Sequence, residues 1–151
     1  MGTMRIGERF RVSGTVVPVE LVSMRGGELV FGNNVYINYG TSICAQQSIT
    51  IGNNCLLGAY TSIIDTDFHD IYDHNKPGKT KPVIIEDDVW LANHVTVTKG
   101  VTIGKGAIVS TGSVVFTDIP PYTIYRGNPA VFVRSIDPNQ AQNRSGGLPG
   151  E

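Results

Sequence analysis

The chain has 151 residues, the length of a single domain, and 40% of them are hydrophobic, which is enough for one core. Its 12 lysines and arginines against 13 aspartates and glutamates leave a net charge of −1. This balance argues against a basic surface for binding nucleic acid or an anionic membrane. No apolar run reaches the ~18 residues of a membrane span, so we expect no transmembrane segment.

The N-terminal residues 1–12 contain three arginines where a secretion signal has its apolar stretch. Further along the chain, Cys44 and Cys55 are too few for a disulfide-bonded secreted domain. We interpret them as small buried side chains. We therefore expect a cytoplasmic protein.

The hydrophobic residues are mainly β-branched. The chain has 17 valines and 15 isoleucines against 6 leucines and 6 alanines, together with 18 glycines. Branched side chains favour strands, and glycine permits tight turns. The composition therefore predicts an all-β chain with many turns.

A six-residue repeat runs from residue 31 to residue 120, with a bulky apolar residue at every sixth position and two interruptions. Each hexad predicts a short strand followed by a turn, and three hexads close one triangular coil of about 18 residues. Neighbouring coils stack at the ~4.8 Å spacing of hydrogen-bonded strands. We expect four regular coils over residues 31–120, preceded by an irregular coil over residues 13–30. The repeated residues are Phe31, Ile37, Ile43, Ile51, Leu57, Ile63, Ile85, Leu91, Val97, Ile103, Val109 and Val115.

The longer interruption covers residues 65–82, is rich in charge, and contains two of the three histidines, His69 and His74. Insertions in repeat proteins project from one face, which is often the binding face. We therefore expect one long extruded loop at this place.

The end of the chain departs from the repeat. Residues 121–136 contain prolines that stop the coil and cover its open edge, so we expect a capping segment there. Residues 137–151 are polar and rich in glycine, which predicts a flexible tail. The sequence thus predicts one β-helix domain over residues 1–136.

Over about residues 32–134 the chain resembles the hexapeptide-repeat acyltransferases, in the branch of maltose, galactoside and polysaccharide O-acetyltransferases. The features that carry this resemblance are the repeat, the segments DTDFHDIYD and IEDDVWLANH, and the ending GNPA. The resemblance implies a left-handed parallel β-helix, although parallel crossovers in general prefer the right hand. It also implies a homotrimer that transfers acetyl from acetyl-CoA to a saccharide hydroxyl, without a covalent intermediate and without a metal.

The same resemblance implies that His69 is the catalytic general base. An imidazole can accept the proton of a hydroxyl that attacks a thioester and can return it to the leaving thiolate. Asp67 or Asp65 could orient the ring, and we place Asp67 on the substrate side. Asn38 falls where the family has an asparagine that hydrogen-bonds the acceptor sugar. The other interpretation of Asn38 is a corner asparagine with left-handed backbone.

For the acyl donor, the resemblance implies a groove between two neighbouring β-helices. We expect Trp90 on the outside of the coil, covered by the donor or by a neighbouring subunit. The residues assigned to the donor are Trp90, Ala92, Asn93, Thr111, Gly112 and Arg134.

Two cations that the family uses for phosphate binding are missing from the pattern. Phe116 and Thr117 stand where the family has Thr-Lys, and Val131 stands where it has an arginine. The replacements that the sequence offers are Arg126, Lys99 and Lys105.

Two other functions remain open at this stage. The γ-class carbonic anhydrases share the fold and bind zinc with three histidines, two of them five residues apart, as His69 and His74 are. His94 would be the third ligand, although it could equally line the predicted cleft or close a corner. Against zinc, the histidine pair lies in an extruded loop, and the Trp90 and GNPA segments are those of the transferases. The second alternative is a β-helix that serves only in assembly.

Overall fold

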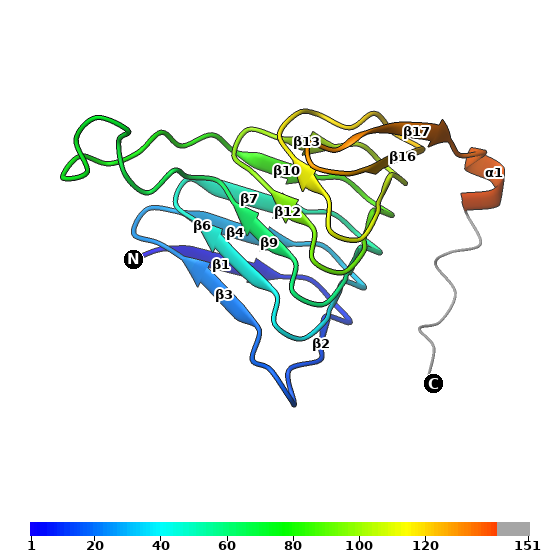
Figure 1. Ribbon diagram of the computed structural model, residues 1–151. Coiled ribbons are helices and arrows are strands. Elements are labelled where there is room, and N and C mark those ends of the chain that lie inside the picture. The colour runs from blue at the N-terminus through cyan, green and yellow to red at the C-terminus, as the bar shows by residue number, and fades with distance from the viewer. Residues whose placement is uncertain (142–151) are drawn as a thin grey trace.

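The computed structural model describes residues 1–141, and residues 142–151, most of the predicted tail, lie outside the described part (Figure 1). Short strands wind into a triangular prism whose three faces are sheets, which we name A, B and C. Sheet A contains, in order, β1 (Thr3–Ile6), β4 (Glu28–Phe31), β7 (Ser48–Ile51), β10 (Val83–Ile85) and β13 (Thr102–Ile103). Sheet C contains β3 (Glu20–Ser23), β6 (Ser42–Ala45), β9 (Ser62–Ile64), β12 (Thr96–Val97) and β15 (Val114–Val115).

Sheet B is the longest of the three. Its strands pair in parallel, except that β16 and β17 form an antiparallel pair at the top. In order, they are β2 (Arg11–Val12), β5 (Tyr36–Ile37), β8 (Leu56–Leu57), β11 (Trp90–Leu91), β14 (Ile108–Val109), β16 (Thr123–Arg126) and β17 (Val131–Ser135).

The core confirms the six-residue repeat. Every repeated residue points into the prism, and none is more than 2% exposed. Residues at equivalent positions of successive coils lie in register, so each sheet contributes one inward column. For sheet A the column contains Phe31, Ile51, Ile85 and Ile103; for sheet B, Ile37, Leu57, Leu91 and Val109; for sheet C, Ile43, Ile63, Val97 and Val115.

The prism has five regular coils, so the prediction of an irregular first coil over residues 13–30 was wrong. β1, β2 and β3 pair in register with the strands of the next coil, with Ile6 opposite Phe31 and Val12 opposite Ile37. The repeat was hard to see here because residues 13–19 form a longer turn before β3. In addition, Ile6 and Val12 close the open end of the prism, and they remain 49% and 45% exposed.

The C-terminal segment caps the other end. The β16–β17 pair continues sheet B beyond the last coil, and Ile119 bridges to Ile103 at the end of sheet A. A short helix, α1 (Pro138–Ala141), follows where the sequence predicted a flexible tail. Asp137 starts this helix, because its carboxylate accepts the N–H of Asn139 at 2.9 Å, and Pro138 suits the first helical position.

Residues 65–82 leave the prism between β9 and β10, and we call this extruded segment the arm. Figure 1 shows the arm in green, projecting well beyond the edge of the sheets. Its two sides are joined by antiparallel bridges between Thr66 and Thr80 and between His69 and Pro77. The prediction of a single long extruded loop is therefore confirmed.

Both cysteines are free thiols. Cys55 lies in the core, and burial raises the pKa of its thiol to about 12. Cys44 is half-buried on the outer face of sheet C, where partial burial and the nearby carboxylates of Asp65 and Glu20 raise the pKa of its thiol. Within residues 1–141, no helix is long and apolar enough to span a membrane.

Candidate functional site

The turns between the sheets form three vertical edges of the prism, which we call corners. The B–C corner consists of residues 38–41, 58–61, 92–95 and 110–113 in successive coils. The A–B corner consists of the turns that follow β4, β7, β10 and β13. The arm leaves the prism at the third corner, between sheets C and A.

Asp65 fixes the base of the arm. Its side chain is fully buried, and its carboxylate accepts backbone N–H groups of Gln46, Gln47 and Ser48 at 2.7–2.8 Å. Its carbonyl oxygen accepts the N–H of Lys81 at 3.0 Å, so one residue ties both sides of the arm to the preceding coil. Because its carboxylate is fully engaged there, Asp65 does not orient His69.

Asp67 makes the second attachment of the arm. Its carboxylate lies 2.5 Å from the Lys99 ammonium, on the turn that follows β12. Only its main-chain carbonyl contacts His69, as the acceptor of the backbone N–H at 2.7 Å. Asp67 therefore positions the arm. Its carboxylate binds Lys99 and does not orient the imidazole of His69.

The imidazole of His69 is held by the main chain of the arm itself. Its Nδ1 lies 2.9 Å from the carbonyl oxygen of His74. A carbonyl can only accept, so we assign the ring proton to Nδ1, which leaves the lone pair on Nε2. The His74 carbonyl is placed by the tight turn in which Asp70 accepts the N–H groups of Tyr72 and Asp73. His69 is exposed on the arm with its basic nitrogen available.

The residues assigned to the donor and the acceptor lie largely together, along the B–C corner. Asn38 begins the turn of the second coil, and Ala92 and Asn93 begin that of the fourth. Thr111 and Gly112 lie within the turn of the fifth coil. The Asn38 Oδ1 accepts the N–H of Tyr39, and the Asn93 Oδ1 accepts the N–H of Ala59, both at 2.9 Å. In residues 1–141 neither amide NH₂ group has a hydrogen-bond partner, so both can donate to a ligand.

The backbone separates the two interpretations of Asn38. At the A–B and B–C corners the third residue after a core residue has left-handed backbone, and Asn34 and Asn54 occupy that position at the A–B corner with φ of 55° and 56°. Asn38 directly follows the core residue Ile37 and does not have this conformation; Gly40 has it instead. Asn38 is therefore not a conformational corner asparagine.

Trp90 points outward from sheet B, as predicted, and is 44% exposed. Leu56 and Ile108 lie beside it in register on the neighbouring strands. Arg134 lies on β17 opposite Ile124, at the top of the same sheet. Trp90 and Arg134 thus share sheet B, which adjoins the B–C corner.

Two of the three candidate replacement cations form ion pairs with carboxylates away from the residues assigned to the donor. Lys99 pairs with Asp67 at the arm, and Lys105 lies at the A–B corner, 3.7 Å from Asp88. Arg126 is the last residue of β16 and is exposed. The next residue, Gly127, donates its backbone N–H to the Ser113 hydroxyl at 3.0 Å. Of the three, Arg126 is therefore the cation that lies beside the residues assigned to the donor.

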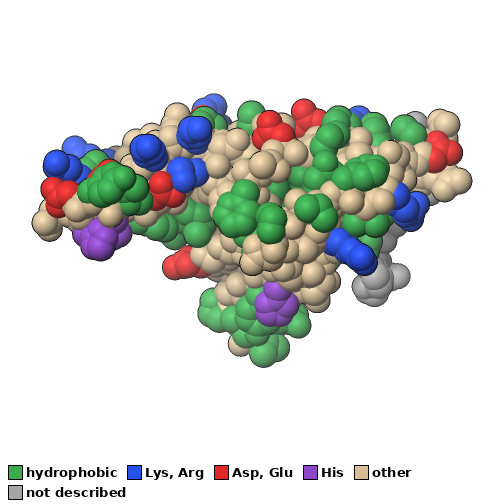
Figure 2. All heavy atoms as spheres, turned by 45° about the horizontal axis from the view of Figure 1, so that its top comes forward, with side chains coloured by type: hydrophobic (Ala, Val, Ile, Leu, Met, Phe, Trp, Pro, Cys, Tyr) green, Lys and Arg blue, Asp and Glu red, His purple; other side chains and the backbone are tan. Residues whose placement is uncertain are grey.

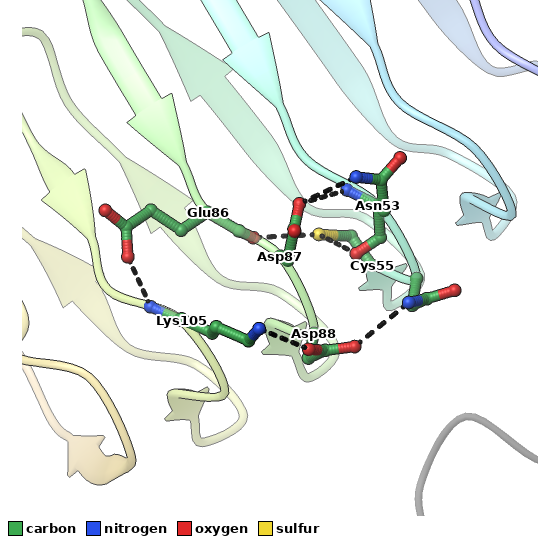
Figure 3. Close-up of polar contacts among 7 residues, drawn as sticks. Asn53, Cys55, Glu86, Asp87, Asp88 and Lys105 are labelled. Atoms are coloured by element: carbon green, nitrogen blue, oxygen red, sulfur yellow. Dashed lines mark hydrogen bonds and ion pairs between the residues drawn. The ribbon is translucent and has the colours of Figure 1, made fainter. Parts of the chain in front are cut away.

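The A–B corner carries a polar ladder whose groups satisfy one another. Figure 3 shows Asp87 accepting the backbone N–H and the side-chain NH₂ of Asn53, at 2.7 and 3.1 Å. The Glu86 carboxylate accepts the N–H of Lys105 at 2.7 Å, and its carbonyl accepts the Cys55 thiol at 3.1 Å. This ladder stabilises the corner and needs no bound ion.

The three histidines do not converge. His94 lies at the B–C corner, where its ring stacks on Tyr60 with centroids 4.9 Å apart and planes 12° from parallel. His69 and His74 lie in the arm at another corner, with ring centroids 6.3 Å apart. Within residues 1–141 no three histidine, cysteine, aspartate or glutamate side chains form a metal-binding group. The zinc alternative therefore has no geometric basis in this part of the chain.

Comparisons with known proteins agree with this architecture. Residues 82–117 match the family described as bacterial transferase hexapeptide (six repeats), and residues 48–64 match the hexapeptide repeat of succinyl-transferase. Over 148 residues the chain is 32% identical to the putative lipopolysaccharide biosynthesis O-acetyl transferase WbbJ of Escherichia coli, covering 90% of this chain and 74% of WbbJ. The chain belongs to the hexapeptide-repeat acetyltransferases.

Other relatives point the same way. Galactoside O-acetyltransferase of Escherichia coli is 32% identical over 114 residues, which are 74% of this chain and 56% of that protein. The crystal structure of the hexapeptide-repeat acetyltransferase VCA0836 of Vibrio cholerae superimposes with a TM-score of 0.77 at 30% identity, over 87% of this chain and 73% of that one. The expected left-handed parallel β-helix is thereby confirmed. The chain spans about half the length of the first two curated relatives, 56% and 42%.

Proposed function

We propose that this protein transfers an acetyl group from acetyl-CoA to a hydroxyl of a saccharide, with His69 as general base. The observation that carries the proposal is the hydrogen bond from His69 Nδ1 to the His74 carbonyl, which leaves Nε2 as a proton acceptor on an exposed arm. Family membership supports the reaction class. The galactoside and polysialic acid O-acetyltransferases among the relatives support a saccharide as the acceptor.

The reaction needs only one proton carrier. Nε2 of His69 takes the proton of the acceptor hydroxyl while the hydroxyl oxygen bonds to the acetyl carbonyl carbon. The carbon–sulfur bond then breaks, and the imidazolium returns its proton to the CoA thiolate. The products are an acetyl ester and a free thiol, and no acyl-enzyme forms. The His74 carbonyl keeps Nδ1–H in place and stabilises the imidazolium.

The donor lies along the B–C corner and the adjoining face of sheet B. A crystal structure of the Vibrio cholerae relative contains acetyl-CoA, which supports acetyl-CoA as the donor here. Trp90 supplies exposed apolar area, and the corner supplies the NH₂ group of Asn93 and the open backbone around Gly112. Arg126 and Arg134 are the cations near the upper end of this path.

The active site is shared between subunits of a homotrimer. His69 projects on the arm from the corner between sheets C and A, whereas Asn38 and the donor residues lie at the B–C corner of the same prism. Placing His69 of one subunit against Asn38 and the donor of the next joins all the required groups. The arm also carries Ile71 and Tyr72, 72% and 91% exposed, which a neighbouring subunit would cover.

A pair of variants tests the assignment of the base. We expect His69→Ala to lower the rate of CoA thiol release with a galactoside or maltose acceptor by about 10²- to 10⁴-fold, the usual contribution of a general base. His74→Ala should retain much of the activity, because its contribution to His69 is a main-chain carbonyl. Circular dichroism and size-exclusion chromatography should show both variants folded and assembled. Full turnover by His69→Ala would contradict the proposal.

A further inference from the structure

The B–C corner carries an exposed aromatic cluster that the sequence did not single out. Tyr39 and Tyr60 are 36% and 43% exposed, and their rings meet edge to face with centroids 5.5 Å apart and planes at 89°. Tyr60 in turn stacks on His94, at 4.9 Å. Figure 2 shows hydrophobic side chains gathered around a histidine at the lower edge of the molecule, away from the arm.

Tyr60 acts as the support of this cluster. One face of its ring covers Gly40, where an added Cβ would lie 2.5 Å from the ring, and the other face is covered by His94. Its backbone N–H is bonded to the carbonyl of Tyr39 at 3.0 Å. Both faces of Tyr60 are therefore occupied, and the ring of Tyr39, braced at a right angle, is the one left to receive a ligand.

Tyr60 and His94 have a backbone conformation that is unfavourable for residues with side chains. Both have φ of 58°, in the left-handed region that Gly40 and Gly112 occupy in other coils of the same corner. Packing of the ring over a glycine of the preceding coil accounts for part of this left-handed conformation. Tyr122, which continues the A–B corner upward, has φ of 52° and covers Gly106 in the same way. Tyr122 has no aromatic partner among the described residues, so ring stacking distinguishes the B–C corner.

Asn38 lies next to this cluster and points to the kind of ligand. Its Oδ1 is engaged by the Tyr39 N–H, which leaves the amide NH₂ as a donor one residue away from the exposed ring. A pyranose has an apolar C–H face and a rim of hydroxyl groups. An aromatic ring beside an amide donor matches that combination, since the ring covers the C–H face while the amide binds a hydroxyl.

We infer that Tyr39 is a specificity-determining residue, on which one face of the acceptor's pyranose ring rests while Asn38 donates to a hydroxyl. This inference rests on the proposed function for the identity of the reaction, and it adds the subsite that selects the acceptor. Tyr60 and His94 are positioning residues, because they act by holding the ring of Tyr39.

Saturation-transfer NMR tests the inference without requiring turnover. The probes are methyl galactoside, maltose and an oligosialic acid, each with the assembled protein. We expect transfer to the ring protons of at least one sugar with the wild-type protein and with Tyr39→Phe, which keeps the ring. Tyr39→Ala should weaken binding about tenfold, the effect of losing one aromatic contact. The control Tyr122→Ala should bind like the wild type, because it disturbs the same kind of turn at another corner.

Kinetics separate this inference from the proposed function. In the thiol-release assay, Tyr39→Ala should raise KM for the acceptor about tenfold and leave KM for acetyl-CoA unchanged. Unchanged sugar binding by Tyr39→Ala, equal loss in Tyr122→Ala, or no sugar bound by the wild type would overturn the inference. Sugar binding at Tyr39 without any thiol release would instead overturn the proposed function alone.

Discussion

Asp65 shows how one buried side chain can determine where a distant functional group lies. Its carboxylate holds three consecutive backbone N–H groups of the turn between β6 and β7, and the arm begins at the same residue. The orientation of the arm, and with it the position of His69, is thus set inside the prism.

Removing this carboxylate should destabilise the protein. In Asp65→Ala, the N–H groups of Gln46, Gln47 and Ser48 lose their acceptor, which costs about 2–5 kcal/mol for three such bonds. For a protein of this size we expect Tm to fall by about 5–15 °C in thermal denaturation followed by circular dichroism. The control Asp70→Ala removes two similar bonds within the arm, where water can replace them, and Tm should hardly change. Equal Tm values for the two variants would contradict this role.

Single residues also mark what the sequence could and could not predict. The resemblance of the segment DTDFHDIYD to the family implied a role for His69. The hydrogen-bond partner of its ring is the carbonyl of His74, and no sequence pattern marks a main-chain group. The carboxylates of Asp65 and Asp67 were candidates for that partner on spacing alone. Tyr60 was missed although a signal exists, because it stands third after a core residue, where Gly40 and Gly112 stand in equivalent turns.

At the level of elements, the hexads predicted the coils because one inward side chain in six decides the phase of each strand. The same rule failed for β1 and β2, since Ile6 and Val12 lie at an open end and are only half-buried. The arm was predicted as an interruption. Its direction depends on contacts with the turn that follows β12, which the local sequence does not specify.

The ion pair between Asp67 and Lys99 should be a second contact, besides those of Asp65, that keeps the arm against the prism. Reversing either charge, in Asp67→Lys or Lys99→Asp, should speed chymotrypsin cleavage at Phe68 and Tyr72 about two- to fivefold, which corresponds to about 0.5–1 kcal/mol for a partly exposed pair. The double swap should restore slow cleavage. Lys76→Glu, which disturbs only the exposed pair with Asp73, should cleave like the wild type. A double swap that cleaves as fast as the single variants would argue against the clamp.

At the scale of the whole molecule, the prism places its functional groups on different edges. The arm with His69 leaves at one corner, and Asn38, the aromatic cluster and the donor residues line another. A rigid stack of coils cannot bring two of its own edges together, so the proposed function requires a site that more than one chain completes. Assembly of several chains around a shared axis satisfies this requirement with identical contacts at each interface.

Complementation between inactive variants measures this most directly. His69→Ala and Asn38→Ala should each be nearly inactive as pure proteins. When equal amounts are unfolded together and reassembled, about a quarter of the sites should combine an intact His69 from one subunit with an intact Asn38 from the next. We predict that thiol release recovers to about a quarter of the wild-type rate. No recovery in mixed assemblies of confirmed composition would contradict the shared site.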